Sequence, residues 1–585
     1  MRMKNSNCWV PCNCLIVMTI GLIFFGSGCP PKQGPTAWFA ATPLTGPAPL
    51  QVQFEDQSEP GSEDIVAWFW DFGDGLTSTE VNPIHTYQNA GLYTVSLSVT
   101  TDVGEDTWFR EDYIEVLESG EGEGEFPEGE LEGQEPEGEG QGEGEGELPE
   151  GEGQEEGEGE SGGFVEVPDP LSGHNPVFPL QAVSVPSSGQ SIFDPDFGLA
   201  QRRVTRGLKV RQEYSRHDPF NADHSFILLT DIASGDWRVY RTASVPYDTD
   251  AQAVTTLSLE EPRWDPADPN VIWGTQEFRI LTVNMLHPED QTVIKDFAED
   301  PAIQPVLAAN PDLYRITMKD EGESSADKRY WAFILQGVNQ DYRARYIFCW
   351  DRQADDVVGV YTLPLAESDL DWVGMSYLGN WVLIGGMETN SGNLAGLTMA
   401  NRELTQFHRL DYTTSHADIG LDSAGNEVIV MQNNRTDYID MIPLSVDVQP
   451  ILEAGGSYAG TNRIPVIRLF YDSEDPQGLN SGVHISCNMP GYAVVSTYIA
   501  PDTPAQNWLD RKIVVVKLDA ANPRTFYLAK VYGTRGEYWE ETQATVATDG
   551  SRIVWATNWN QNVGQENVWV MQLSLPVDWP ATMLQ

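Results

Sequence analysis

Apolar and polar residues alternate with a period of two along much of this chain, and helical periodicity is scarce. The alternation is clear in residues 50–54 (LQVQF) and 93–99 (YTVSLSV), and such runs end in turns rich in Gly, Pro, Asp or Asn. A period of two places successive side chains on opposite faces of a strand. The pattern therefore predicts an all-β protein built from short strands and tight turns.

One segment, Glu118 to Gly163, breaks this pattern. It holds 19 Glu and no Lys or Arg, and its large apolar side chains are one Phe and two Leu. Such a composition buries too little apolar surface to offset the entropy of ordering. Residues 118–163 are predicted to be a disordered, extended acidic linker between a small module, residues 36–117, and a large module, residues 164–585.

Three short motifs narrow the fold of the small module. Residues 70–75 read WDFGDG, residues 82–87 read NPIHTY, and residues 90–95 read AGLYTV. In this order and spacing they resemble the PKD domain family. The resemblance implies an immunoglobulin-like β-sandwich over residues 36–117, used for spacing, adhesion or polysaccharide contact and without catalysis.

The motif residues also have direct physical explanations. His85 belongs to the fold signature of the family, and we assign it no site role. The other motif residues are expected to shape the turn or fill the core between the sheets: Gly73, Gly75, Asp71, Asp74, Trp70 and Tyr87. Three further tryptophans have two alternative roles, either stacking on a sugar ring or packing in the core or between domains: Trp38, Trp68 and Trp108.

A turn containing Asp, Asn or Gly, followed by an apolar strand, recurs in the large module. The copies lie at residues 221–229, 265–273, 328–334, 378–384, 422–430, 490–496 and 548–555. They resemble the hairpins of TolB-like, PD40-type propeller blades. Seven units are predicted to start near residues 217, 261, 328, 372, 416, 484 and 540.

A seven-bladed β-propeller is therefore expected for residues 164–585, since this spacing suits four-stranded blades with insertions. A strand near residues 178–186 is expected to complete the last blade and close the ring, which removes exposed sheet edges. A two-sheet lectin sandwich is the alternative fold.

The first 29 residues have the features of an export signal. Two basic residues precede the apolar run 15–25, which is followed by Gly-Ser-Gly and Cys29. This arrangement resembles a bacterial lipobox, although Gly26 stands where that motif usually has a branched apolar residue. The resemblance implies lipidation of Cys29, and a plain secretory signal is the alternative. Both place the mature chain in the cell envelope or outside the cell.

Charge and cysteine content limit the partners and the covalent framework. The formal net charge is −54, so neither nucleic acid nor an anionic membrane surface is expected as a partner. A lipid on Cys29 would be the contact with a membrane. Cys349 and Cys487 are the two cysteines of the folded modules, and isolated buried thiols are favoured over a disulfide.

Several histidines lie near the predicted blade starts, where inner strands line a central channel: His217, His224, His408, His416 and His484. This arrangement loosely resembles the oligogalacturonate lyases, propellers in which His and Gln hold a manganese ion near the axis. The resemblance implies His217, His416 and His484 as catalytic candidates and His416, His484 and Gln543 as metal ligands. The final blade departs from the family, because residues 538–544 contain no His, although Glu540 and Gln543 offer hard donor atoms.

Other chemistry has weaker support in the sequence. The acidic strings 367–371 and 472–475 are candidates for Ca²⁺, with solvated loops as the alternative. No cofactor is favoured, and a manganese or calcium ion is the alternative.

The leading hypothesis for function is a lipid-anchored surface protein, not an enzyme, whose PKD spacer and propeller bind polysaccharide or protein. The alternative is a lyase or hydrolase that acts on acidic polysaccharide with a metal near the channel axis.

Overall fold

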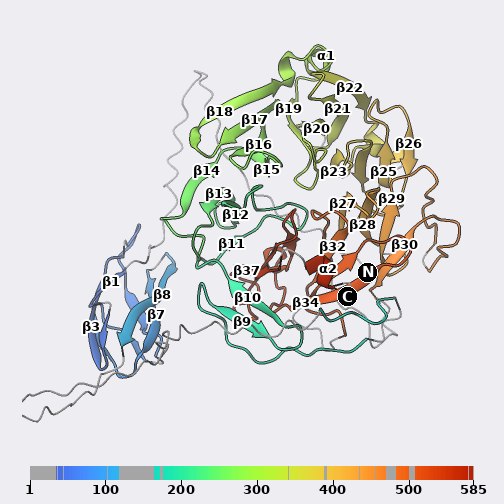
Figure 1. Ribbon diagram of the computed structural model, residues 1–585. Coiled ribbons are helices and arrows are strands. Elements are labelled where there is room, and N and C mark those ends of the chain that lie inside the picture. The colour runs from blue at the N-terminus through green and yellow to red at the C-terminus, as the bar shows by residue number, and fades with distance from the viewer. Residues whose placement is uncertain are drawn as a thin grey trace, which may run out of the picture. The chain divides into compact units, whose positions relative to one another are not determined.

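The computed structural model forms two compact units, one ending at Pro149 and one beginning at Glu150, and each is described by itself (Figure 1). It describes residues 35–117 and 164–583 except for a set of short gaps: 36, 38, 44, 59, 75, 102, 172–174, 340–341, 388–389, 391, 434, 454, 470–481, 500–506 and 577–578. The predicted signal sequence, Cys29 and the acidic linker lie outside the described residues.

Two packed sheets form the first unit. One has the order β1-β3-β6 and the other β2-β8-β7-β4-β5. Their bounds are β1 Phe39–Thr42, β2 Thr45–Pro47, β3 Leu50–Asp56, β4 Ala67–Asp71, β5 Thr77–Ser78, β6 Ile84–Tyr87, β7 Gly91–Thr100 and β8 Glu105–Leu117. The alternation predicted for residues 50–54 is present, since Leu50, Val52 and Phe54 face the core. Trp70 and Tyr87 are fully buried between the sheets, as expected.

The WDFGDG turn is stabilised by its own side chains. Asp71 Oδ1 accepts a hydrogen bond from the Gly73 amide over 2.9 Å, and Asp74 binds the ring of His85 over 2.7 Å. His85 also stacks on Phe72 with a centroid distance of 4.1 Å. Gly73 has φ +78°, and a Cβ there would lie 2.2 Å from a main-chain oxygen. His85 therefore belongs to the fold.

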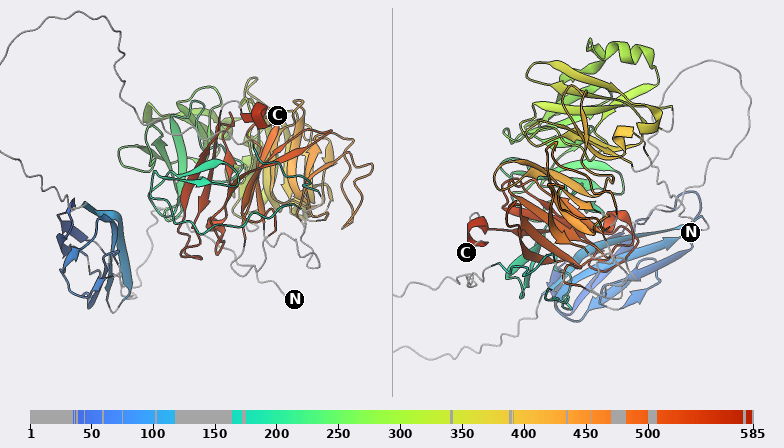
Figure 2. Two further views of the ribbon diagram at one scale, coloured as in Figure 1. Left: turned by 60° about the horizontal axis from the view of Figure 1, so that its bottom comes forward. Right: turned by 90° about the vertical axis from the view of Figure 1, so that its right-hand side faces the viewer.

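The second unit is a ring of seven sheets, seen along its axis in Figure 1 and from two other directions in Figure 2. In the described residues the first three blades are β11 Val210–Arg211, β12 Phe226–Asp231, β13 Asp236–Arg241 and β14 Ala253–Leu257; β15 Glu260–Trp264, β16 Val271–Gln276, β17 Arg279–Asn284 and β18 His287–Asp296; and β19 Leu313–Thr317, β20 Tyr330–Gly337, β21 Ala344–Asp351 and β22 Asp356–Thr362.

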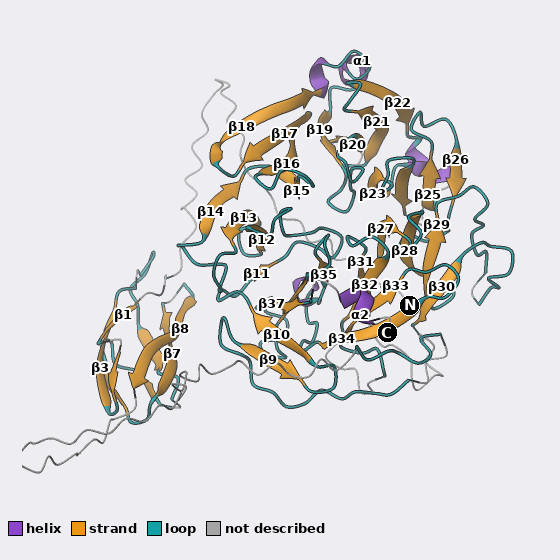
Figure 3. Cartoon of the chain, in the orientation of Figure 1, coloured by secondary structure: helices purple, strands orange, loops and turns teal. Residues whose placement is uncertain are grey.

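The next three blades are β23 Leu370–Met375, β24 Val382–Gly386, β25 Gly396–Ala400 and β26 Phe407–Arg409; β27 Ala417–Leu421, β28 Glu427–Asn433, β29 Tyr438–Pro443 and β30 Ile464–Arg468; and β31 Val483–Ser486, β32 Tyr492–Thr497, β33 Lys512–Lys517 and β34 Arg524–Lys530. The seventh contains β35 Thr545–Val546, β36 Arg552–Thr557 and β37 Trp569–Ser574. Helical segments are short (Figure 3): η1 Phe297–Glu299, α1 Gln304–Ala309, η2 Leu365–Glu367, η3 Gly392–Leu394, η4 Tyr538–Glu540 and α2 Trp579–Met583.

The repeats seen in the sequence correspond to one strand of each blade. Every turn-plus-strand copy falls on the second strand of its sheet, from β12 in the first blade to β36 in the seventh. The predicted start near residue 328 is therefore wrong for the third blade, whose inner strand is β19, and the first blade begins at β11. The motif marks the turn just before the second strand of each blade. In the first and third blades the connection after the inner strand is long, so the motif lies furthest from the start of the blade there.

Ring closure differs from the prediction. Residues 178–186 form no strand, and β10 (Leu199–Arg203) and β9 (Ser191–Asp194) add to the seventh sheet instead. Strand β10 pairs antiparallel with β37, and the two colours meet there in Figure 1. The buried ammonium of Lys530 in β34 pairs with Asp194 and Asp196. Prolines at both ends of the predicted segment lack the N–H that a ladder needs.

Apolar side chains fill the spaces between neighbouring sheets, for example Val494, Ile513 and Trp555 between the sixth and seventh blades. Cys349 and Cys487 are free and buried, which confirms the expectation of isolated thiols. Among the described residues, no helix has both the length and the apolar character that a membrane span requires.

Candidate functional site

The central channel is shaped by two long loops. Residues 212–225 follow β11 and residues 318–329 follow β19, and the corresponding connections of the other blades are at most half as long. Both loops turn toward the axis and contact each other there, as their hydrogen bonds show.

Buried charged groups join the two loops. Arg216 Nη1 donates to the main-chain oxygen of Glu321 over 2.9 Å, and Nη2 lies 3.0 Å from the Glu321 carboxylate. His217 binds Glu323 through Nδ1, and its Nε2 lies 2.8 Å from the main-chain oxygen of Asp320. In the neutral ring Nδ1 donates to Glu323, and Nε2 accepts from the Arg263 guanidinium, whose Nη2 lies 2.7 Å away. Burial, together with the nearby Arg263 cation, lowers the pKa of His217 to about 4, so its ring is neutral at pH 7.

Arg263 of β15 completes this network. Its Nε donates to Glu323 over 2.7 Å, and its Nη2 donates to the main-chain oxygen of Asp320 over 2.6 Å. The exposed fractions of Arg216, His217 and Arg263 are 2%, 5% and 5%, so these three side chains are buried, while the Glu321 and Glu323 side chains remain partly exposed. We name it the axial plug: Arg216, His217, Arg263, Asp320, Glu321 and Glu323.

A second cluster brings together two of the predicted histidines. The rings of His416 and His484 have centroids 4.4 Å apart. Tyr214 places its hydroxyl 3.1 Å from His416 Nδ1, and Glu541 lies 2.7 Å from His484 Nε2. His484 is fully buried, and its Nδ1 has no hydrogen-bond partner. Burial lowers the pKa of His416 to about 3 and that of His484 well below its usual value, so both rings are neutral at pH 7.

These side chains do not fit a divalent cation as they are arranged. The oxygen of Gln543, the atom that would bind a metal, accepts a hydrogen bond from the Arg211 guanidinium over 2.5 Å. Glu540 accepts main-chain amides, including that of Gly536 over 2.6 Å. Among the described residues, no group of three His, Cys, Asp or Glu side chains gathers as metal ligands. Of the Ca²⁺ candidates, residues 472–475 lie outside the described residues.

The structure thus separates the predicted site residues. His416 and His484 are adjacent, while His217 belongs to the axial plug. Sequence reasoning missed Tyr214 and Glu541. Tyr214 lies shortly before His217 and Glu541 shortly before Gln543, but neither belongs to a recognisable motif. The remaining histidines have other contacts, because His408 binds the main-chain oxygen of Val448 over 2.7 Å and His224 lies 3.5 Å from Asp549.

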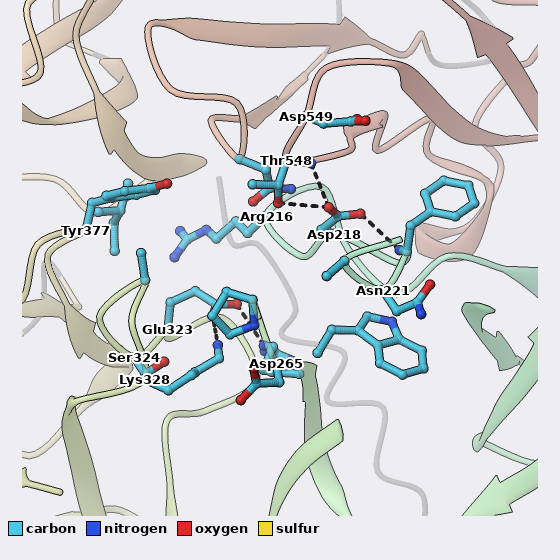
Figure 4. Close-up of a pocket in the computed structure, with 18 of the residues that line it drawn as sticks. Arg216, Asp218, Asn221, Asp265, Glu323, Ser324, Lys328, Tyr377, Thr548 and Asp549 are labelled. Carbon is cyan, nitrogen blue, oxygen red and sulfur yellow. Dashed lines mark hydrogen bonds and ion pairs between the residues drawn. The ribbon is translucent and has the colours of Figure 1, made fainter. Parts of the chain in front are cut away.

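A pocket of about 300 Å³ opens on the channel at the ends of the inner strands, and all seven blades contribute to its lining (Figure 4). Apolar and aromatic walls come from Phe220, Trp264 and Tyr377. Arg216 and Lys328 bring cationic groups into the same space. Arg216, Arg263 and Glu323 line the pocket and also belong to the axial plug, so the plug forms its inner end.

Carboxylates in the pocket are already bonded. Asp218 Oδ2 accepts the Thr548 amide over 2.7 Å, and Asp265 Oδ1 accepts two main-chain amides. The two oxygens of Asp418 accept the amides of Ile419 and Cys487 over 2.8 and 2.5 Å. Burial raises the pKa of Asp218 to about 6 and that of Asp418 to about 7.

Donors in the pocket retain free capacity. Arg216 Nε has no hydrogen-bond partner, and Lys328 Nζ lies 3.9 Å from its nearest carboxylate oxygen, on Glu323. The Tyr377 hydroxyl points into the same space (Figure 4). A ligand rich in acceptor oxygens would complement this lining, since a buried donor without a partner is costly.

Comparison with known proteins identifies the first unit. Residues 32–116 match the family model described as PKD domain, which confirms the resemblance seen in the sequence. Collagenase ColQ1 of Bacillus cereus (strain Q1) is 46% identical over 66 residues, which are 11% of this chain and 7% of that protein. Pre-pro-metalloprotease PrtV of Vibrio cholerae serotype O1 is 45% identical over 56 residues, 10% of this chain and 6% of that protein. The chain spans under a tenth of these curated relatives.

Solved structures similar to the second unit are distant in sequence. An oligogalacturonate lyase in complex with manganese shares 11% identity, with 68% of this chain and 98% of that chain covered and a TM-score of 0.44. A putative TolB from Agrobacterium tumefaciens shares 10% identity, with 63% and 99% covered and a TM-score of 0.27. The propeller assignment rests on the seven sheets of this chain, which agree with the predicted fold.

Proposed function

We propose that this protein is exported to the cell envelope, where its PKD domain serves as a spacer and its propeller binds a polysaccharide in the axial pocket. The observation that supports the binding role most directly is the pocket itself, to which every blade contributes. Concave sites with aromatic walls and a few converging polar groups are the usual form of a small-molecule site.

The chemistry of the lining suits a sugar. Trp264 and Tyr377 offer aromatic surface, whereas Arg216 and Lys328 offer hydrogen-bond donors. Saccharides present apolar ring faces and many oxygen acceptors, so both kinds of group have partners. No catalytic step is needed for this role.

Binding can be tested with the mature full-length protein on an array of defined glycans. We expect binding to a restricted set of saccharides and at least a tenfold loss in the Tyr377→Ala variant, which removes a pocket wall. Tyr361→Ala is the matched control, because Tyr361 lies on the outer strand β22, away from the pocket. Absence of binding to any saccharide would contradict the proposal.

Envelope attachment is proposed from the sequence before the PKD domain. The lipobox-like residues end at Cys29, and several acyl chains on one cysteine are sufficient for stable anchoring. Mass spectrometry of the mature N-terminus should detect a lipidated Cys29. An unmodified N-terminal peptide starting at another residue would instead indicate a secreted protein.

A second candidate function, lysis or hydrolysis of an acidic polysaccharide, is supported by the contact between His416 and His484 and by the unpartnered Nδ1 of His484. Three nearby guanidinium groups, of Arg211, Arg216 and Arg535, would favour an anionic ligand. The side chains as arranged do not fit a metal, so no metal-dependent step is derived. Turnover of polygalacturonate that His484→Gln abolishes would support this candidate, whereas elemental analysis would detect a bound manganese or calcium ion.

A further inference from the structure

The inner end of the axial pocket is closed. Arg216 and Glu323 line the pocket, and both are tied into the axial plug through Glu321, His217 and Arg263. The three cations and rings at its centre, Arg216, His217 and Arg263, are buried, and each is bonded to a carboxylate or main-chain oxygen of the plug, so opening the plug would leave buried polar groups without their partners. A ligand therefore enters and leaves by one mouth.

The far side of the plug is also occupied. Tyr214 lies beyond it and packs against His484, with ring centroids 5.5 Å apart. The buried Arg211 side chain also occupies this region, and its Nη1 donates to the main-chain oxygen of Trp539 over 2.6 Å. These residues come from the first, sixth and seventh blades, so the channel is filled from several directions. A polymer cannot pass along the axis.

The size of the pocket sets a second limit. Its volume of about 300 Å³ is at the low end of the range for small-molecule sites, about 300–1,000 Å³. Such a volume suits a small ligand and not an extended chain.

The open end is marked by Asp549, whose side chain is 58% exposed, whereas the Arg216 side chain at the inner end is 1% exposed. Arg216 Nε, a donor without a hydrogen-bond partner, is therefore at the closed end.

From this geometry we infer that the propeller binds the terminal unit of a saccharide chain and not an internal stretch. This inference rests on the proposed polysaccharide-binding function. A chain end can insert between Trp264 and Tyr377 and place its oxygens near Arg216 and Lys328, while the rest of the chain extends out of the mouth. An internal unit has a neighbour on both sides, and the closed end leaves no room for the second.

The experiment uses mature full-length protein and linear oligosaccharides of two to eight units that share the linkage of the best array glycan. Each oligosaccharide is tested in three forms. One is unmodified, one is reduced at its reducing end, and one is methylated at the terminal hydroxyls of its non-reducing end. Isothermal titration gives the dissociation constant per mole of chain. We expect constants within about threefold across lengths above two units, and at least a tenfold loss when one of the two ends is modified.

Pocket variants connect this result to the site. Tyr377→Phe removes only a hydroxyl that points into the pocket and should weaken binding three- to tenfold, while Tyr361→Phe should leave it unchanged. Affinity that rises steadily with chain length, or equal binding of end-modified and free chains, would overturn the inference but leave the proposed function intact. Binding that is insensitive to Tyr377→Phe and Tyr377→Ala places the site elsewhere and overturns the inference. Failure to bind any saccharide would overturn both proposals.

Discussion

Several side chains near the channel axis are buried polar groups, and burial changes their protonation. Asp418 is an example. Asp418 is 2% exposed and lies close to the Arg216 guanidinium, which lowers its pKa, while burial has the larger opposite effect. The carboxyl group consequently keeps its proton to about pH 7 in the folded protein, whereas the unfolded chain releases it near pH 3.8.

Substitution of Asp418 by Asn should therefore change the pH dependence of stability. Between pH 4 and pH 7 the folded state binds more protons at this site than the unfolded state, so this contribution to stability is lost as pH rises. Relative to Asp418→Asn, the wild type should lose up to roughly 4 kcal/mol between pH 4 and pH 8, at about 1.4 kcal/mol per tenfold change in proton affinity. Urea denaturation at several pH values measures this, and a constant difference between the two proteins would contradict it.

Gly322 tests the close packing of the long loop after β19. A Cβ at this position would lie 1.8 Å from the main-chain oxygen of Val373, so Gly322→Ala forces the backbone to move. We expect a loss of about 3 kcal/mol or more in the free energy of unfolding. Gly425→Ala is the control, because Gly425 has φ +83° and no atom within 4 Å of its Cβ position, so only about 1–2 kcal/mol should be lost. Equal losses would show that the loop adapts.

At the scale of elements, each blade combines an apolar sheet with a few buried polar groups. The fifth blade shows this most clearly. Arg463, just before β30, pairs with Asp411 over 2.6 Å and with Asp440 over 2.7 Å, and all three side chains are fully buried. Tyr458 donates a further hydrogen bond to Asp440 over 2.7 Å. The group holds the outer strand against β29.

Removal of this guanidinium should be costly because two carboxylates would remain buried without a cation. We expect Arg463→Ala to lose about 3–5 kcal/mol of unfolding free energy. The control is Arg238→Ala, since Arg238 is 37% exposed and pairs with Asp231 over 2.8 Å, and its loss should be about 1 kcal/mol or less. Similar losses in the two variants, measured by urea denaturation, would contradict the assigned role of the buried group.

At the scale of the whole molecule, the second unit is a closed ring whose last sheet contains the earliest strands of that unit, β9 and β10. Closure pairs β10 with β37 and buries Gln201 and Arg203. A ring without these strands would expose the edge of β37, and exposed edges favour aggregation.

Deletion of residues 187–203 should therefore lower the thermal unfolding midpoint of the propeller and promote association, as measured by calorimetry and size-exclusion chromatography. Deletion of residues 1–163 is the control and should leave the midpoint unchanged, because the two units are separate compact bodies. An unchanged midpoint after deletion of residues 187–203 would show that β9 and β10 do not stabilise the ring.

Much of the fold was predictable because it depends on local patterns. The WDFGDG turn identified the PKD domain, and the turn before each second strand revealed seven blades. The closing strands were not predicted, because β10 (LAQRR) is polar and its pairing partner lies more than 360 residues away. His416 and His484 lie next to each other, but their neighbours Tyr214 and Glu541 could not be predicted, because no motif marks them.

The amino-acid sequence by itself determined the β architecture, the division at the acidic segment and the number of blades, since periodicity, turn chemistry and composition act over a few residues. Only the tertiary structure decided how the axis is filled. Tyr214 reaches His416, Glu541 reaches His484, and Arg263 joins two loops into a plug. These contacts depend on the closure of the ring, which brings distant segments to one axis, and no local pattern encodes that convergence.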